Sequence, residues 1–242
     1  MGSSTRSSRE LVLLTHGIAS TRFFLAPLAW RLRNAGFATR LYGYPSIWWS
    51  NRSHGEKLAR VLRRLAPGYD KVHLVVHSMG GVVARCALQE ELPENFGRVV
   101  MIAPPNRGSH MATRLAKHGD STLWNSFVVA PHRLASSTLP ELMDTPESFV
   151  NQLGPVPEGI EVGVVAASRD RMVQRGGTEL DGQKDHITAE GWHTAVLWTR
   201  ETADLTERFL RTGSFATQNA PSAIDPRIAS GAVASETLLA ES

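Results

Sequence analysis

The chain has 242 residues, of which 42% are hydrophobic and 20% are charged, so it is apolar enough for one large globular domain and too apolar for a disordered protein. The net charge of +3 comes from Lys and Arg residues that are scattered along the chain, which argues against a nucleic-acid-binding protein. A single cysteine, Cys86, excludes an internal disulfide and a cysteine-ligated zinc site, and the nine histidines show no metal-ligand spacing, so no metal is predicted.

The N-terminal part of the sequence begins with a polar stretch, residues 1–9, which we expect to be loose. The apolar run at residues 11–14 is too short for a signal peptide, and no run approaches the length of a membrane span, so the cytoplasm is the expected compartment. Residues 10–15 are predicted to form a buried strand, and the turn His16-Gly17-Ile18 follows it directly.

Helices and strands are predicted to alternate after this turn. A helix that begins near Phe24, with Pro27 in its first turn, leads to a strand at residues 37–44. The later strands are expected from Val72 and at residues 99–103, 161–167 and 186–189, and the later helices at residues 55–66, from Gly80 to about Leu92, and before Gly213. This alternation predicts a parallel sheet with helices on both faces.

Two stretches depart from the alternation. Residues 104–157 lack a clear strand pattern and are long for a connection within one sheet, which predicts an insertion, with ordinary outer helices as the alternative. Residues 216–242 are rich in Ala, Ser, Pro and Thr and are predicted to form a flexible C-terminal tail. The folded domain is therefore expected to span residues 10–215.

The chemistry is predicted to centre on residues 71–85, where a buried strand is followed by a helix with almost no residues between them. Ser78 lies at this corner, so we expect a strained backbone there, a hydroxyl lifted clear of the sheet, and helix N–H groups directed at whatever it attacks. An incidental serine before a glycine-rich helix is the alternative. The stretch resembles the nucleophile elbow, Gly-x-Ser-x-Gly, of the α/β-hydrolases, with Val76 in place of the first glycine.

The resemblance implies a catalytic triad in the chain order Ser, Asp or Glu, His. Asp170 lies just past a predicted strand and His193 just past the last one, so both are expected at the same edge of the sheet as Ser78. Other candidates fit less well because they fall in a strand, a polar loop or the insertion, or too close to the base; they are Asp144, Glu147, Asp181, Asp185 and His186. His77 is expected to point away from Ser78 and is not assigned as the base.

The resemblance also implies an oxyanion hole made by two backbone N–H groups. One belongs to Met79, the residue after the nucleophile, and the other to Ile18 in the His-Gly turn. His16 is expected to hold that turn. Because one strand alone is predicted before the turn, the chain resembles the minimal α/β-hydrolase fold: a mostly parallel, doubly wound sheet of about six strands, with a lid insertion at about residues 105–157, after the strand that ends near Ala103.

The family resemblance implies a serine hydrolase that cleaves carboxylic esters, an esterase or lipase, without a cofactor. The substrate is expected to be a small-molecule or lipid ester, and any membrane contact to be transient, at a lipid interface. Phe23, Phe24 and Trp192 are predicted to line an apolar acyl pocket, with core packing as the alternative. A thioesterase, an acyltransferase and a catalytically degenerate binding protein are the alternative functions, whereas Ser78 excludes the chemistries that use an aspartate nucleophile.

Overall fold

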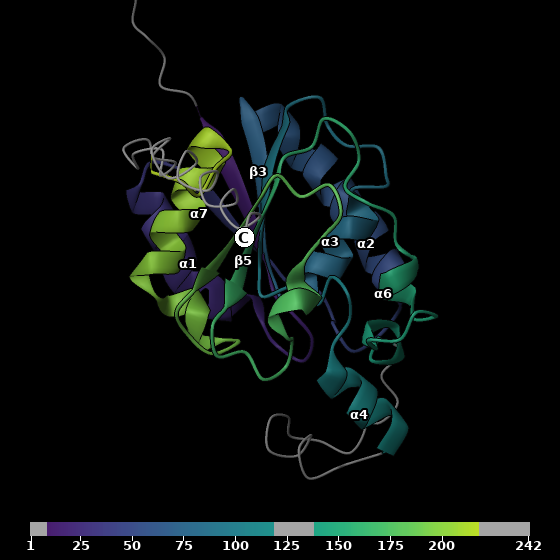
Figure 1. The fold of residues 1–242 in the computed structure, drawn as a ribbon. Coiled ribbons are helices and arrows are strands. Elements are labelled where there is room, and N and C mark those ends of the chain that lie inside the picture. The colour runs from purple at the N-terminus through teal and green to yellow at the C-terminus, as the bar shows by residue number, and fades with distance from the viewer. Residues whose placement is uncertain (1–8, 119–137, 218–242) are drawn as a thin grey trace, which may run out of the picture.

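Six parallel strands form a single sheet in the order β2-β1-β3-β4-β5-β6 (Figure 1). The structure, a computed structural model, describes residues 9–118 and 138–217. The strands are β1 (Glu10–Thr15), β2 (Ala38–Tyr42), β3 (Lys71–His77), β4 (Phe96–Ile102), β5 (Val162–Ala167) and β6 (Asp185–Ala189). The order reverses between β1 and β3, and ligands of such sheets bind at the carboxyl ends of the strands next to this switch point.

Helices cover both faces of the sheet, as predicted (Figure 1). The helices α1 (Ala26–Asn34) and α7 (Arg200–Thr212) pack on one face, and α2 (Asn51–Leu65) and α3 (Gly80–Ala87) pack on the other. Strand β1 serves both layers, because Leu11 and Leu13 face α2 and α3 while the alternate residues Val12 and Leu14 face α1 and α7. Burial on two faces explains why this strand is a continuous apolar run.

Two helix boundaries differ from the predicted ones by a few residues. A short 3-10 helix, η1 (Arg22–Leu25), occupies the position where α1 was expected to begin, and Pro27 lies in the first turn of α1. The helix after Ser78, α3, ends at Ala87 and does not continue to Leu92. Pro93 disfavours helical backbone at Leu92, so the helix could not have extended past that residue.

Helix α2 begins at Asn51, one turn before the predicted start at residue 55. This first turn is polar in sequence, yet it is buried. Ser50 caps the helix with its hydroxyl, which accepts a backbone N–H of the first turn. Asn51 and His54 are fully buried; Asn51 donates to the Glu141 carboxylate at 2.7 Å, and the Nε2 of His54 lies 2.7 Å from the Trp48 carbonyl oxygen. These partners lie outside the helix, so the apolar periodicity of the sequence does not reveal the turn.

The predicted insertion is the segment between β4 and β5. Its described part contains α4 (His110–His118), the 3-10 helix η4 (Pro140–Leu142) and α6 (Phe149–Gln152). Its contacts with the rest of the domain include that of Glu141 with Asn51 and that of Thr138, whose hydroxyl donates to the Ser46 carbonyl oxygen at 3.2 Å. Residues 119–137 lie outside the described residues, and the assignment of the segment as a lid stays a prediction.

The predicted loose N-terminus and C-terminal tail fall mostly at residues 1–8 and 218–242, outside the described ranges. In the part of the chain that is described, no helix combines the length and the apolar character needed to cross a bilayer. Two further short 3-10 helices, η5 (Arg175–Thr178) and η6 (Ala195–Trp198), follow β5 and β6, and α7 is capped by Gly213 in the left-handed conformation.

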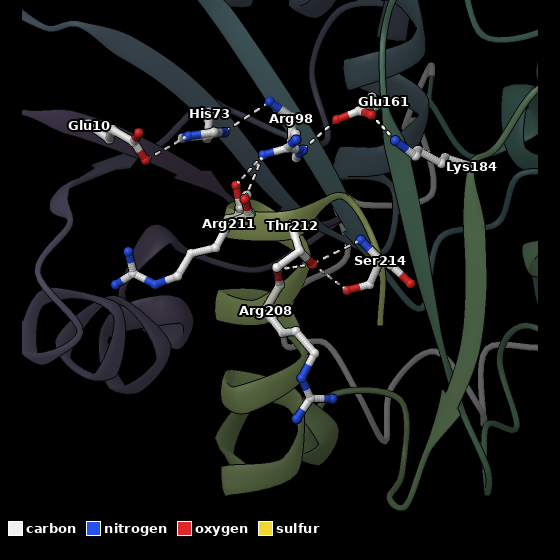
Figure 2. Close-up of polar contacts among 10 residues, drawn as sticks. Glu10, His73, Arg98, Glu161, Lys184, Arg208, Arg211, Thr212 and Ser214 are labelled. Carbon is white, nitrogen blue, oxygen red and sulfur yellow. Dashed lines mark hydrogen bonds and ion pairs between the residues drawn. The ribbon is translucent and has the colours of Figure 1, made fainter. Parts of the chain in front are cut away.

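A network of polar contacts joins the strands at the amino edge of the sheet, far from the carboxyl ends (Figure 2). His73 is fully buried in β3; its Nδ1 accepts the backbone N–H of Arg98 at 2.9 Å, and its Nε2 lies 3.3 Å from the Glu10 carboxylate. Arg98 pairs with Glu161, which also pairs with Lys184, and the Arg98 guanidinium donates to carbonyl oxygens in the last turn of α7. This edge is therefore braced by structure-forming contacts.

Candidate active site

Ser78 occupies a sharp corner between strand and helix. β3 ends one residue before it and α3 begins two residues after it. Its φ of 53° lies in the left-handed region, which is strained for a residue with a side chain. The N–H of Ser78 donates to the Ile102 carbonyl oxygen at 2.9 Å, and its side chain lies against Gly17, where an added Cβ would be 2.7 Å from the Ser78 Cβ. The corner thus requires glycine at position 17.

The elbow accommodates a valine at the position where the family pattern has its first glycine. Val76 is fully buried in β3. A Cβ added to Gly80 would lie 3.4 Å from the Val76 Cβ and only 2.9 Å from the His16 carbonyl oxygen. Glycine at position 80 is therefore required chiefly by the backbone after β1, against which α3 packs closely, and Val76 fits beside it.

His193 bridges Ser78 and Asp170. Its Nε2 lies 2.9 Å from the Ser78 Oγ, and its Nδ1 lies 2.6 Å from the Asp170 Oδ2. The other carboxylate oxygen of Asp170 accepts the backbone N–H groups of Met172 and Val173 at 2.8 and 2.9 Å. A carboxylate that accepts from Nδ1–H leaves Nε2 free to accept the serine proton, which is the tautomer that general-base chemistry requires.

The surroundings of Asp170 keep it ionised. Burial alone would raise the pKa of its carboxyl, but the hydrogen bond and charge of His193, with the backbone N–H groups of Val173 and Met172, outweigh burial and lower the pKa below its usual value. The side chain is 3% exposed, so water does not compete for these contacts. A buried carboxylate held in this way can orient the imidazole and stabilise it when it becomes charged.

His77 points away from Ser78, and its backbone-directed contact links the elbow to the loop of His193. Its Nε2 lies 2.9 Å from the His193 carbonyl oxygen, so the ring donates this hydrogen bond. The two imidazole rings lie 5.0 Å apart. Burial, followed by the proximity of His193, lowers the pKa of His77 to about 3, so the ring is neutral near pH 7. The sequence offered no sign of this contact.

The two predicted oxyanion-hole donors belong to turns that face Ser78. Met79 is the N-cap of α3 and directly follows Ser78. Ile18 lies in the turn after β1, next to Gly17, which packs against the serine side chain. Among the described residues, neither the Ile18 nor the Met79 backbone N–H donates a hydrogen bond. Unpaired N–H groups beside a nucleophile are suited to an oxyanion.

His16 holds the turn that carries Ile18. Its Nδ1–H donates to the Gly17 carbonyl oxygen at 2.9 Å, and its Nε2 accepts the Tyr44 N–H at 3.3 Å. The Tyr44 ring stacks on the imidazole at 4.7 Å, and its hydroxyl donates to the His16 carbonyl oxygen. Burial lowers the pKa of His16, which favours this neutral, doubly bonded form.

The competing triad candidates make other contacts. Asp144 is hydrogen-bonded to Thr113, Asp181 to Arg107, Asp185 to Ser214, and His186 to Thr178. In the described part of the chain, no group of three His, Cys, Asp or Glu residues is arranged to hold a metal ion.

The three residues predicted to line an acyl pocket lie on the surface. Phe23, Phe24 and Trp192 are 66%, 42% and 46% exposed, so the alternative of core packing is wrong for all three. Phe24 stacks on Trp198 at 6.1 Å, and Phe23 and Trp192 each lie under an arginine guanidinium. Their role in acyl binding stays a prediction.

A cavity of about 230 Å³ lies at the far end of α3 and includes no triad residue. Arg85, 6% exposed, lines it and donates to the carbonyl oxygens of Asn106, Leu153 and Gly154 at 2.7, 2.8 and 3.3 Å. The sequence does not reveal this cavity, because the partners of Arg85 come from distant loops.

Comparison with known proteins agrees with the architecture. Residues 3–143, more than half of the chain, match the family described as alpha/beta hydrolase fold, and the protein therefore belongs to this family. The family resemblance drawn from the elbow sequence is confirmed. Among curated proteins, no sequence matches at a significant level.

Solved structures with the same architecture include several hydrolases. The mature form of the lipase BlEst2 from Bacillus licheniformis has a TM-score of 0.70 and 15% sequence identity, with 87% of this chain and 94% of that chain covered. The phospholipase PlaB from Legionella pneumophila has a TM-score of 0.65 and 16% identity, covering 86% and 60%. The type II thioesterase YbtT of the yersiniabactin pathway has a TM-score of 0.61 and 14% identity, with 85% of this chain and 93% of that chain covered. At these identities the likeness shows the fold, and the predicted fold class is confirmed.

Proposed function

We propose that the protein is a serine hydrolase that cleaves carboxylic esters through an acyl-enzyme on Ser78. The observation that carries this proposal is the series of hydrogen bonds from Ser78 through His193 to Asp170, at the carboxyl ends of β3, β6 and β5. Membership of a hydrolase fold family and similarity to solved lipases support the same reaction class. The choice of a carboxylic ester as the substrate is part of the same proposal.

The proposed reaction has two halves. In the first, the Ser78 Oγ attacks the ester carbonyl carbon and its proton passes to His193 Nε2, while the N–H groups of Ile18 and Met79 stabilise the oxyanion. The imidazolium then gives this proton to the leaving alcohol, and the acyl group stays on Ser78. In the second half, His193 takes a proton from water, the hydroxide attacks the acyl carbon, and the acid leaves as the proton returns to Ser78.

A thioesterase or an acyltransferase with the same residues is the alternative. Attack on a thioester follows the same steps, with a thiol as the leaving group, and an acyltransferase replaces water with a bound alcohol. One of the similar solved structures is a thioesterase, so the fold accommodates this chemistry. The residues of the triad alone do not choose between these substrates.

The test is hydrolysis of p-nitrophenyl esters from acetate to palmitate by the native chain and by Ser78→Ala. We expect turnover of the shorter esters and a fall in kcat of about 10⁴-fold or more in the variant, because the nucleophile is lost. Ser53→Ala, on α2, is the matched control and should keep native activity. Activity that survives in Ser78→Ala would contradict the mechanism, and turnover of acyl thioesters but no esters would favour the thioesterase.

A further inference from the structure

Two arginine–aromatic pairs lie on the loops that carry the proposed catalytic groups. In η1, a few residues beyond the turn of Ile18, the Arg22 guanidinium lies 5.0 Å from the centre of the Phe23 ring. Beside the triad, the Arg171 guanidinium lies 4.9 Å from the centre of the Trp192 ring. Arg171 directly follows Asp170, and Trp192 directly precedes His193, so the second pair spans the acid and the base of the triad.

The loops that carry the two pairs are held against Ser78 and His193 by contacts already described. Gly17 lies against the Ser78 side chain, which places the start of the first loop beside the hydroxyl. Arg22 is close enough to His16 to lower its pKa, and its side chain packs over Gly43. The hydrogen bond between Asp170 and His193 holds the second loop in the same way.

The positive charges of these two arginines are not neutralised by the protein. In the described ranges, no carboxylate lies within 4.0 Å of the Arg22 or Arg171 guanidinium. Five other arginines in these ranges form ion pairs, and the rest of those described, like these two, do not; the paired ones are Arg98, Arg107, Arg169, Arg200 and Arg211. The acidic residues next to the second pair in the sequence have other partners, because Asp170 binds His193 and Glu190 pairs with Arg169. An exposed aromatic face holds a guanidinium in place without cancelling its charge.

We infer that the substrate carries an anionic group, a phosphate or a carboxylate, in addition to the ester, and that Arg22 and Arg171 bind this group. The inference rests on the proposed function and names its substrate class. A guanidinium presents a planar set of donors that matches two oxygens of a phosphate or carboxylate. Stacking on Phe23 and Trp192 restricts each arginine before the substrate arrives, which reduces the entropy lost on binding.

Matched esters test the inference. In the first series, p-nitrophenyl hemisuccinate is compared with p-nitrophenyl butyrate, so the charge lies in the acyl half. In the second, dihexanoyl phosphatidylglycerol is compared with dihexanoyl phosphatidylcholine, so a net charge lies in the alcohol half, and this series identifies a phospholipid source. The measured quantity is the ratio of kcat/KM for the anionic ester to that for its partner.

We expect this ratio to exceed one in at least one series and to fall about two- to fivefold in Arg22→Gln and in Arg171→Gln, the range of an exposed ion pair. Arg200→Gln removes one positive charge from the exposed face of α7 and should leave the ratio as in the native chain. Added salt should lower kcat/KM for the anionic ester more than for its partner, because screening weakens contacts between exposed charges.

Two results would contradict different parts of this scheme. Hydrolysis of the uncharged esters with no preference for charge, or a preference that Arg22→Gln and Arg171→Gln leave intact, would overturn the inference and leave the proposed function standing. No turnover of any ester would overturn the proposed function and the inference with it. Thermal unfolding of each variant verifies that it is folded.

Discussion

Burial keeps His77 uncharged, and this matters because His193 becomes an imidazolium during the proposed reaction. A charged neighbour with its ring 5.0 Å away would oppose that step, whereas a neutral ring does not. The same neutral ring donates its Nε2–H to the His193 carbonyl oxygen and so fixes the loop that carries the base. His77 is in this sense a positioning residue, although it does not touch the reacting atoms.

Replacing His77 by phenylalanine keeps the ring and removes the donor. We expect kcat for p-nitrophenyl butyrate to fall about 10- to 100-fold with little change in KM, because small displacements of a catalytic group are costly. His77→Gln places an amide donor at a similar distance and should recover part of the loss. Native kcat in His77→Phe, with the fold verified by thermal unfolding, would show that the contact has no influence on His193.

At the elbow, the backbone of the turn after β1 lies close to Ser78, at the end of β3, and Gly17 makes this approach possible. Gly17→Ala would add a Cβ 2.7 Å from the Ser78 Cβ, too close for carbon atoms, so the turn after β1 or the serine must move. We expect kcat to fall by about 100-fold or more, since the donor of Ile18 and the hydroxyl lose their alignment. Gly68→Ala, where no atom lies within 4 Å, is the control and should retain activity. Equal activities in the two variants would contradict this reading.

The elements that could be predicted from the sequence are those whose burial is continuous. The runs in β1 and β5 are apolar throughout because both faces of the sheet are covered, and the helix pattern of α7 ends at Gly213 as a left-handed glycine requires. The first turn of α2 was missed because Asn51 is buried by a partner, Glu141, that lies far along the chain. Local patterns cannot reveal such partners.

The candidate site was predictable in outline because chain order and strand ends determine where side chains gather. Ser78, Asp170 and His193 were chosen as residues just beyond predicted strands, and the structure brings them within hydrogen-bond distance of one another. The exposure of Phe23 and Trp192 could not be predicted, because an aromatic residue next to a strand has the same sequence signature in a core and on a rim.

Across the whole molecule, burial disfavours the charged form of several histidines. The pKa is lowered for His16, His54, His73, His77 and His186, in each case chiefly by burial. The unfolded chain, with histidine pKa values near 6.5, then binds protons that the folded chain does not. The contribution of these histidines to the free energy of unfolding is therefore fully present above about pH 6.5 and is lost as the pH falls below it. For His77 the loss continues to about pH 3. Asp170, with its lowered pKa, adds to the loss below about pH 4.

We expect the midpoint of urea unfolding to be nearly constant above about pH 7 and to decrease as the pH falls from about 6.5 to about 5. His77→Gln, which does not titrate, should have a shallower dependence on pH than the native chain. A midpoint that is constant or rises over this range would show that these histidines titrate alike in the folded and unfolded states.

The guanidinium of Arg85 has a consequence for how this fold can vary. It joins α3 to Asn106, near the start of the β4–β5 connection, and to Leu153 and Gly154, near its end. Both margins of the connection are thus held against α3, the helix that follows Ser78, the proposed nucleophile. The buried Leu142 and Val150 and the contact of Glu141 with Asn51 also lie between these margins. A change of sequence or length there that keeps these residues is expected to leave the elbow in place, which makes this connection a site for grafting new specificity.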